Sequence, residues 1–167
     1  MSATGRVWRF GDDIDTDVLA PGLYMKSPLA ELAKHCLESI DPRFAKEVRP
    51  GDIVVAGRNF GMGSSREQAA QALQALGVAA VLAKSFAGIF YRNALNYGLL
   101  ALTCAEVDRI KAGDRLAIDG VKGEAINQAT GERLSCEPLP EHLLEMIEDG
   151  GLVAHLEKKL ARKRAGT

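Results

Sequence analysis

One short stretch of the chain combines residue types that could carry out proton chemistry. The sequence GRNFGMGSSREQAAQAL, residues 57–73, contains two adjacent serines, Ser64 and Ser65, followed directly by Arg66. A serine hydroxyl acts as a base only where its anion is stabilised, and the N–H groups at a helix start together with a guanidinium would provide this. The guanidinium is also a planar fork that fits a carboxylate. The stretch therefore favours proton abstraction by Ser64 from a carbon next to a carboxylate, which Ser65 and Arg66 would hold.

Two interpretations without catalysis also fit this loop. In the first, Ser64 caps the following helix and Glu67 completes a capping box, a role worth about 1 kcal/mol. The same geometry would also serve a catalytic serine. In the second, Gly61 and Gly63 belong to a dinucleotide-binding turn, although an arginine stands where the third glycine is needed. The next strand ends in Lys84 rather than an acidic residue, which only a cofactor with a 2′-phosphate would tolerate.

The elements around the loop predict an α/β fold. Continuous apolar runs at 52–57, 78–85 and 99–104 are typical of buried strands, and they alternate with helical patterns at 66–76 and 86–97. Strands and helices that alternate through short links predict a parallel sheet with right-handed crossovers. The serine loop would then follow the first of these buried strands.

The remaining segments add elements on both sides of this unit. They are a strand at 5–11, an acidic turn region at 12–22, a helix at 29–40, an antiparallel hairpin or meander within 111–140, and helices at 140–150 and 152–164. The hairpin expectation rests on the turn dipeptides Asp119-Gly120 and Thr130-Gly131 between alternating segments. Since no repeat or long linker interrupts the chain, we expect residues 1–167 to form a single domain.

Composition excludes several classes of protein. The net charge is −1, which disfavours nucleic-acid and anionic-membrane partners. No apolar stretch reaches the about 18 residues that span a bilayer, and no signal-type segment is present, so we expect a cytoplasmic protein. The three cysteines, Cys36, Cys104 and Cys136, are far apart and form no CxxC pair. We therefore expect no metal ligation by this chain alone.

Three motifs in order resemble the aconitase superfamily. Residues 59–73, NFGMGSSREQAAQAL, resemble the signature of its separate small, swivelling-domain subunits. Residues 12–24 resemble the aspartate-threonine-aspartate turn of these subunits, and residues 83–102 are similar to the segment after the serine loop. The chain length suits a small subunit of the 3-isopropylmalate dehydratase type. The resemblance implies an aconitase-type swivelling β/β/α domain, in which helices flank a central, mostly parallel sheet and β-hairpins are added.

The resemblance also implies a mechanism divided between two chains. Ser64 would be the catalytic base, acting as an alkoxide that removes a proton from carbon during dehydration. Arg66 would bind a substrate carboxylate and stabilise the alkoxide, and Ser65 would contact the substrate. A [4Fe–4S] cluster, held by a large subunit and not by this chain, would act as Lewis acid on the hydroxyl. The chain would be part of a hydro-lyase, active only with that large subunit in a heterodimer or heterotetramer.

Five residues would support the serine loop. Asp15, Thr16 and Asp17 form the aspartate-threonine-aspartate turn, in which aspartates commonly bond to nearby backbone groups. Gly61 and Gly63 would let the chain turn sharply between strand and helix. We expect the turn to orient the serine loop or to contact the large subunit.

The loop after this turn would select the substrate, a di- or tricarboxylate. Family members often have tyrosine-leucine-arginine there, and Tyr24, Met25 and Lys26 occupy those places here. Lys26 replaces a bidentate group with a point charge. Leu23 and Met25 could line an apolar pocket for an alkyl group, which favours 3-isopropylmalate and 2-isopropylmalate, and with them leucine biosynthesis. The alternatives are homoaconitate, the pair 2-methylmalate and citraconate, or 2,3-dimethylmalate, and, from another class, a nucleotide-binding module without catalysis.

Overall fold

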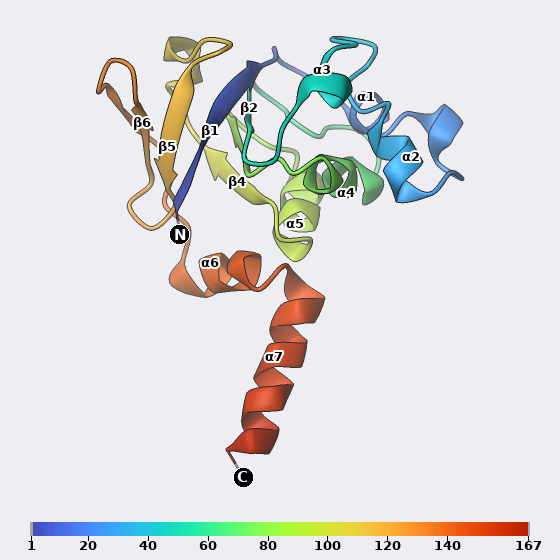
Figure 1. Ribbon diagram of the computed structural model, residues 1–167, viewed down its shortest axis with the longest axis vertical. Coiled ribbons are helices and arrows are strands. Elements are labelled where there is room, and N and C mark those ends of the chain that lie inside the picture. The colour runs from blue at the N-terminus through green and yellow to red at the C-terminus, as the bar shows by residue number, and fades with distance from the viewer. Residues whose placement is uncertain (1, 167) are drawn as a thin grey trace.

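Seven strands form one mixed sheet in the computed structural model, which describes residues 2–166 (Figure 1). Four strands lie parallel: β1 (Ser2–Arg9), β2 (Ile53–Ala56), β3 (Ala80–Ala83) and β4 (Leu100–Thr103). Three strands extend the sheet in antiparallel fashion: β5 (Arg115–Asp119), β6 (Glu124–Asn127) and β7 (Arg133–Ser135). The spatial order is β4-β3-β2-β1-β5-β6-β7, so β1 joins the two parts.

β1 can join them because its two halves pair with different neighbours. Residues 2–6 pair antiparallel with β5, whereas residues 7–9 pair parallel with β2, Val7 lying opposite Ile53. The strand expected at 5–11 therefore begins earlier than the apolar pattern indicated. The central position of β1 follows from this double pairing.

Helices connect and cover the parallel strands. α4 (Gln68–Ala75) leads from β2 to β3 and α5 (Gly88–Asn96) from β3 to β4, since parallel neighbours need such crossovers. Between β1 and β2 lie α1 (Thr16–Leu19), the 3-10 turn η1 (Gly22–Tyr24), α2 (Leu29–Ala33) and α3 (Phe44–Glu47). A second 3-10 turn, η2 (Val107–Arg109), follows β4, and α6 (Glu141–Glu148) and α7 (Leu152–Ala165) come last. In Figure 1, α1 to α4 gather on one side of the molecule and α7 extends away from the sheet.

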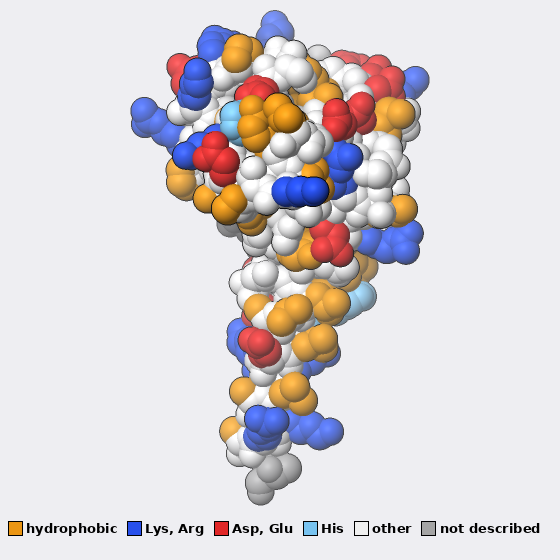
Figure 2. All heavy atoms as spheres, turned by 90° about the vertical axis from the view of Figure 1, so that its right-hand side faces the viewer, with side chains coloured by type: hydrophobic (Ala, Val, Ile, Leu, Met, Phe, Trp, Pro, Cys, Tyr) orange, Lys and Arg blue, Asp and Glu red, His pale blue; other side chains and the backbone are white. Residues whose placement is uncertain are grey.

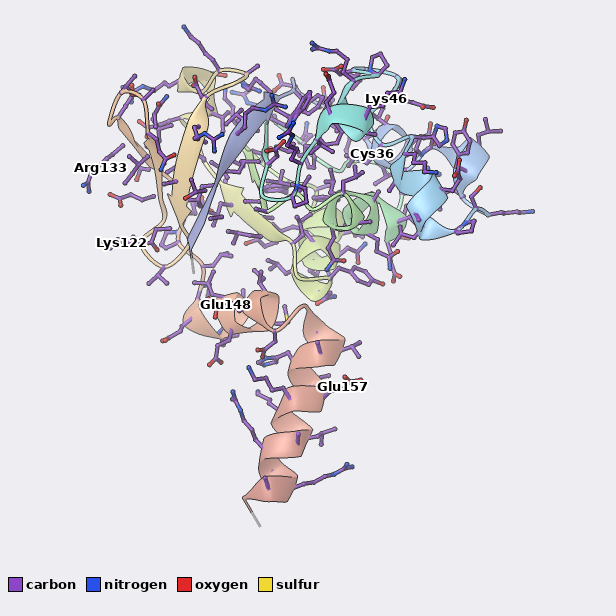
Figure 3. The ribbon with its side chains drawn as sticks, viewed as in Figure 1. Cys36, Lys46, Lys122, Arg133, Glu148 and Glu157 are labelled. Atoms are coloured by element: carbon purple, nitrogen blue, oxygen red, sulfur yellow. The ribbon has the colours of Figure 1, made fainter. Side chains whose placement is uncertain are left out.

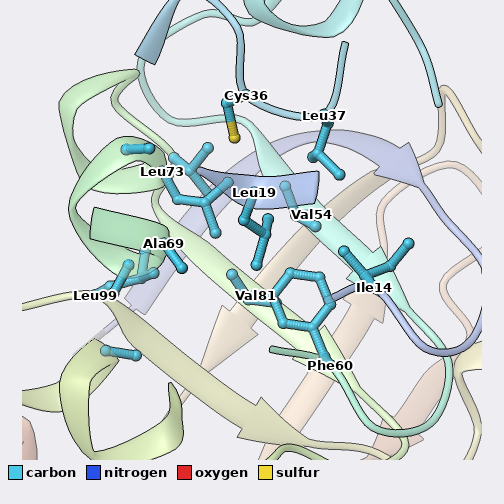
Figure 4. Close-up of a cluster of buried hydrophobic side chains, with 14 of the residues drawn as sticks. Ile14, Leu19, Cys36, Leu37, Val54, Phe60, Ala69, Leu73, Val81 and Leu99 are labelled. Atoms are coloured by element: carbon cyan, nitrogen blue, oxygen red, sulfur yellow. The ribbon is translucent and has the colours of Figure 1, made fainter. Parts of the chain in front are cut away.

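Both faces of the parallel strands are buried, which explains why their sequences are continuously apolar. Val54 and Val81 point into one core, where they meet Phe60 and other apolar side chains from α1, α4 and the loops (Figure 4). Their neighbours along the strands, such as Ile53 and Leu82, belong to a second core that α6 and the antiparallel strands cover. The sheet is thus a rigid base for the loops at its ends.

α7 lies outside both cores. Leu152, Val153, Leu156 and Leu160 are all exposed, and no residue of this helix is buried. Figure 2 shows hydrophobic side chains along the projecting helix. Within residues 2–166, no helix combines the length and the apolar character needed to cross a membrane.

The expected α/β architecture with an antiparallel addition is confirmed, but two local expectations are wrong. The helix expected at 29–40 ends at Ala33, where the N–H groups that follow donate three residues back instead of four. Leu37 then has a φ of 61°, which a right-handed helix does not accommodate. The region 12–22, expected as an acidic turn, contains α1. Asp15 caps this helix through its carboxylate, a signal that the sequence carried.

Candidate functional site

The serine loop, residues 58–67, follows the carboxyl end of β2, where ligands commonly bind in parallel sheets. The loop runs beside the segment that follows β1. Gly61 N–H donates to the carbonyl oxygen of Ile14 over 2.7 Å, and Met62 forms an isolated bridge with Asp15. These contacts bring the glycine-serine loop and the aspartate-threonine-aspartate turn together.

The Thr16 hydroxyl makes two contacts with Ser64, one with its backbone N–H and one with its side-chain hydroxyl. Its hydroxyl oxygen accepts from Ser64 N–H over 3.2 Å and lies 3.2 Å from Ser64 Oγ. Either hydroxyl can be the donor between the two oxygens, but once Ser64 has lost its proton Thr16 must donate, because an alkoxide can only accept. Thr16 is buried, whereas Ser64 and Ser65 are exposed. The pair therefore holds the exposed Ser64 hydroxyl against the buried hydroxyl of Thr16, which can donate to it.

Two glycines allow this close approach. Gly63 has a φ of 114°, and a Cβ there would lie 3.0 Å from Thr16 Oγ1. Gly61 has a φ of 83°, and a Cβ there would lie 2.2 Å from a ring carbon of Phe90 on α5. Both positions need glycine, since other residues seldom adopt a positive φ and the space is already filled.

Arg66 lies against the start of the neighbouring loop. Its Nη1 donates to Asp17 Oδ1 over 3.0 Å and to the carbonyl oxygen of Ala20 over 2.9 Å. The hydrogen bond from Arg66 to Asp17 is the main reason that the pKa of the Asp17 carboxyl lies below its usual value, and a second bond, from Gly22 N–H, lowers it further. Nε and Nη2 of Arg66 make no hydrogen bond to residues 2–166. Half of the guanidinium fork is thus anchored and half is free to bind a carboxylate.

The loop with Tyr24, Met25 and Lys26 begins where Arg66 anchors the chain, but it contains no apolar pocket of its own. Tyr24 stacks on His35, with ring centroids 3.6 Å apart and planes 4° apart. Met25 packs against the core, Leu23 is 85% exposed, and Lys26 is exposed. The expectation that Leu23 and Met25 line an apolar pocket for the substrate therefore stays a prediction about the site shared with the large subunit. No pattern in the sequence predicted that His35 would stack on Tyr24.

The capping-box interpretation is also wrong. α4 begins at Gln68, four positions after Ser64, and Ser64 makes no cap. Glu67 accepts a hydrogen bond from Tyr97 Oη over 2.7 Å instead of reaching back along the helix. Ser64 contacts Thr16 instead, and residues 65 and 66 are not helical. The helix N–H groups therefore do not converge on Ser64 as the sequence suggested.

The cation that a dinucleotide site would need is already paired. Lys84 Nζ donates to Asp108 Oδ2, and this contact lowers the pKa of the Asp108 carboxyl. Arg9 approaches the same carboxylate at 3.5 Å. Lys84 thus neutralises an acidic side chain on η2, which leaves the 2′-phosphate interpretation without its main support.

The described part of the chain shows no ligand set for an iron–sulfur cluster. Within residues 2–166, no group of three histidine, cysteine, aspartate or glutamate side chains is arranged to hold a metal ion. Cys36, Cys104 and Cys136 are free and buried, and burial raises the pKa of the Cys36 thiol. Cys104 Sγ donates to the carbonyl oxygen of Ser135 over 3.4 Å. These residues do not fit the cluster that the family resemblance implies.

Known proteins resemble this chain over nearly its whole length. The Aconitase C-terminal domain family matches residues 29–107. The 3-isopropylmalate dehydratase small subunit 2 of Archaeoglobus fulgidus is 52% identical, over 95% of this chain and 96% of that one. The methanogen homoaconitase small subunit of Methanothermobacter thermautotrophicus is 51% identical, over 93% and 91%. The crystal structure of 3-isopropylmalate dehydratase (LeuD) from Methanocaldococcus jannaschii superposes with a TM-score of 0.93 at 44% identity, covering 100% of both chains.

Proposed function

The chain belongs to the 3-isopropylmalate dehydratase small subunits of the aconitase superfamily, and we propose on that basis that Ser64 is the base in half of its active site. The single observation that supports this most strongly is the pairing of the exposed Ser64 hydroxyl with the buried hydroxyl of Thr16, 3.2 Å away. A fixed donor at this place would stabilise the serine alkoxide, and a serine needs such help to act as a base.

The proposed reaction is the removal of water from a substituted malate. Ser64 as the alkoxide takes the proton from carbon and becomes a neutral hydroxyl, the electron pair of that C–H bond forms the double bond, and hydroxide leaves from the adjacent carbon. The cluster of the large subunit would supply the Lewis acid that accepts this hydroxide. The free N–H groups of Arg66 bind a substrate carboxylate while Asp17 keeps the other side of the guanidinium in place. Ser65 donates a hydrogen bond from its hydroxyl to the substrate. Rehydration at the other carbon completes the isomerisation.

We propose a large subunit as the partner that completes the site. The names of the relatives, which are small subunits, support a partner of this kind. The exposure of Ser64 and Ser65 also supports it, because a base must be shielded from water to be effective. The [4Fe–4S] cluster would belong to that subunit, as the family resemblance implies, and residues 2–166 hold no group of side chains arranged to bind a metal ion.

Observations support two candidate substrates, isopropylmalate and homoaconitate. Isopropylmalate is supported by the names of most of the similar small subunits, and the exposed Leu23 offers an apolar contact for its alkyl group. Homoaconitate is supported by a relative of nearly equal identity, and the exposed cation of Lys26 suits a third carboxylate. We propose isopropylmalate as the substrate, with a cytoplasmic location and a role in leucine biosynthesis, which a deletion strain grown without leucine would test.

The base is tested in the complex reconstituted with the large subunit. The Ser64→Ala variant should assemble normally and lose turnover by orders of magnitude, measured as the ultraviolet absorbance of the unsaturated product. Ser65→Ala is the matched control, because it removes a neighbouring hydroxyl and should raise KM more than it lowers kcat. Near-normal turnover of Ser64→Ala would rule out the proposed role.

The substrate is tested with a panel of isopropylmalate, homoaconitate, 2-methylmalate and 2,3-dimethylmalate. Lys26→Ala should lower kcat/KM for the tricarboxylate most, and Leu23→Ala should lower it for isopropylmalate most. The same ranking of rates in both variants and the unmodified complex would show that this loop does not select the substrate.

A further inference from the structure

β1 and β5 place two arginines directly opposite one another. Arg6 and Arg115 are cross-strand partners in the antiparallel register, and both are exposed. Like charges in such a pair repel and destabilise the sheet. An anion bound between them would remove this repulsion.

Two more cations reach the same place from the segment before β2. Lys46 extends from α3 (Figure 3), and Arg49 lies in the turn that follows it. Together with Arg6 and Arg115 they line a cleft of about 440 Å³. No carboxylate among residues 2–166 pairs with any of these four side chains. The four positive charges therefore meet at one cleft without being neutralised in pairs.

The two acidic residues of the cleft do not cancel these charges. Asp52 is buried, and its Oδ2 accepts hydrogen bonds from Trp8 Nε1 over 2.9 Å and from Arg49 N–H over 3.0 Å. The Asp52 carboxylate thus connects Trp8 to the backbone of Arg49 at the floor of the cleft. Glu47 is the other acidic residue in the lining, so cations exceed carboxylates by two.

The cleft is separate from the serine loop. Asp52 stands immediately before the first residue of β2, whereas the serine loop follows the last residue of that strand. The two sites therefore lie at opposite ends of β2. Nothing in the proposed dehydration uses the cleft, and it needs an explanation of its own.

We propose that this cleft binds a compact polyanion that carries phosphate groups, such as the diphosphate of a nucleotide or a bisphosphate metabolite. The cations come from three directions, namely β1, β5 and the end of α3. A tetrahedral phosphate presents oxygens in several directions, whereas a carboxylate presents two oxygens in one plane. Arginine forks bind phosphate in bidentate fashion, and the cleft volume is within the range of small-molecule sites.

Trp8 gives this proposal a direct readout. It is the single tryptophan of the chain, and the guanidinium carbon of Arg6 lies 4.9 Å from the centroid of its ring. An anion that draws Arg6 away from the ring should change the tryptophan emission. The full-length chain is titrated with inorganic pyrophosphate at constant ionic strength, and a saturable change is expected.

Variants of the cleft decide whether the signal comes from this site. Arg49→Gln and Arg115→Gln should each weaken pyrophosphate binding about tenfold, as expected for the loss of one charge-assisted contact. Arg162→Gln on α7 removes the same charge elsewhere and should bind as the unmodified chain does. Circular dichroism checks that each variant is folded.

Three results would overturn the proposal. The first is the absence of a saturable change at millimolar pyrophosphate, and the second is a change that neither Arg49→Gln nor Arg115→Gln reduces. The third is citrate binding as tightly as pyrophosphate, which would show a site for polycarboxylates instead of phosphates. Weaker binding of citrate is the result expected.

Discussion

Replacing Thr16 with valine removes one hydroxyl from beside Ser64 and keeps the branched shape of the side chain. The hydroxyl oxygen lies 3.2 Å from both Ser64 N and Ser64 Oγ, and the residue is buried. The substitution therefore deletes the fixed donor of the proposed base while it leaves the surrounding packing nearly unchanged. It also leaves Ser64 in place to contact the substrate.

The expected size of the effect depends on the state of Ser64. In the resting protein the contact joins neutral groups, and its loss should lower the free energy of unfolding by about 1 kcal/mol. When Ser64 becomes the alkoxide that precedes proton abstraction, the contact stabilises a negative charge, and one donor to such an oxyanion is worth about 3–4 kcal/mol. The 3.2 Å separation of the two oxygens exceeds the usual value of about 2.7–2.8 Å. We therefore expect a loss of about 100-fold in kcat, or about 2.7 kcal/mol, with little change in KM.

The assay is turnover of the reconstituted complex, followed by the absorbance of the unsaturated product. Thr16→Ser keeps the hydroxyl and loses only a methyl group, so it should retain activity within a few-fold of the unmodified complex. The reasoning is refuted if Thr16→Val stays within about twofold in kcat while Ser64→Ala is inactive. It is equally refuted if Thr16→Ser falls as far as Thr16→Val.

Three further predictions concern stability and reactivity. Gly61→Ala should cost about 3 kcal/mol in urea unfolding, because its Cβ would lie 2.2 Å from a ring carbon; Gly131→Ala, at a φ of 75° in open space, should cost about 1 kcal/mol. Cys36, whose pKa burial raises, should be alkylated by iodoacetamide only after unfolding, as mass spectrometry of native and denatured protein would show. Because Arg66 lowers the pKa of Asp17, their pairing stabilises the fold above about pH 4 and is lost on acidification; Asp17→Asn should flatten the decline in melting temperature there, and an unaltered decline would contradict this.

Elements whose formation depends mainly on residues adjacent in the sequence were predicted well. The buried strands before and after α4 are continuous apolar runs, and the sheet buries both of their faces. α6 and α7 were expected from their helical periodicity; α6 lies within the expected range, and α7 ends one residue beyond it. Where the expectation failed, a long-range contact replaced a local preference: Leu37 N–H donates to the carbonyl oxygen of Val18, and Leu37 adopts a positive φ there.

The candidate site shows the same division. The types of its residues were evident from the sequence, because serine, arginine and glycine between a strand and a helix have few chemical uses. The partners of these residues were not evident. Arg66 was expected to bind a substrate carboxylate and to stabilise the alkoxide, and no pattern in the sequence indicated that Asp17 and the carbonyl oxygen of Ala20 would anchor its Nη1.

The sequence by itself determined the class of fold, the family and the identity of the proposed base, because periodicity and motif spacing are properties of contiguous residues. Only the tertiary structure decided what stands beside that base. Thr16 and Ser64 are 48 positions apart, and they meet because β1 and β2 are parallel neighbours whose following loops emerge at the same edge of the sheet. The pairing of two such loops depends on how the strands pack, and no local pattern records it.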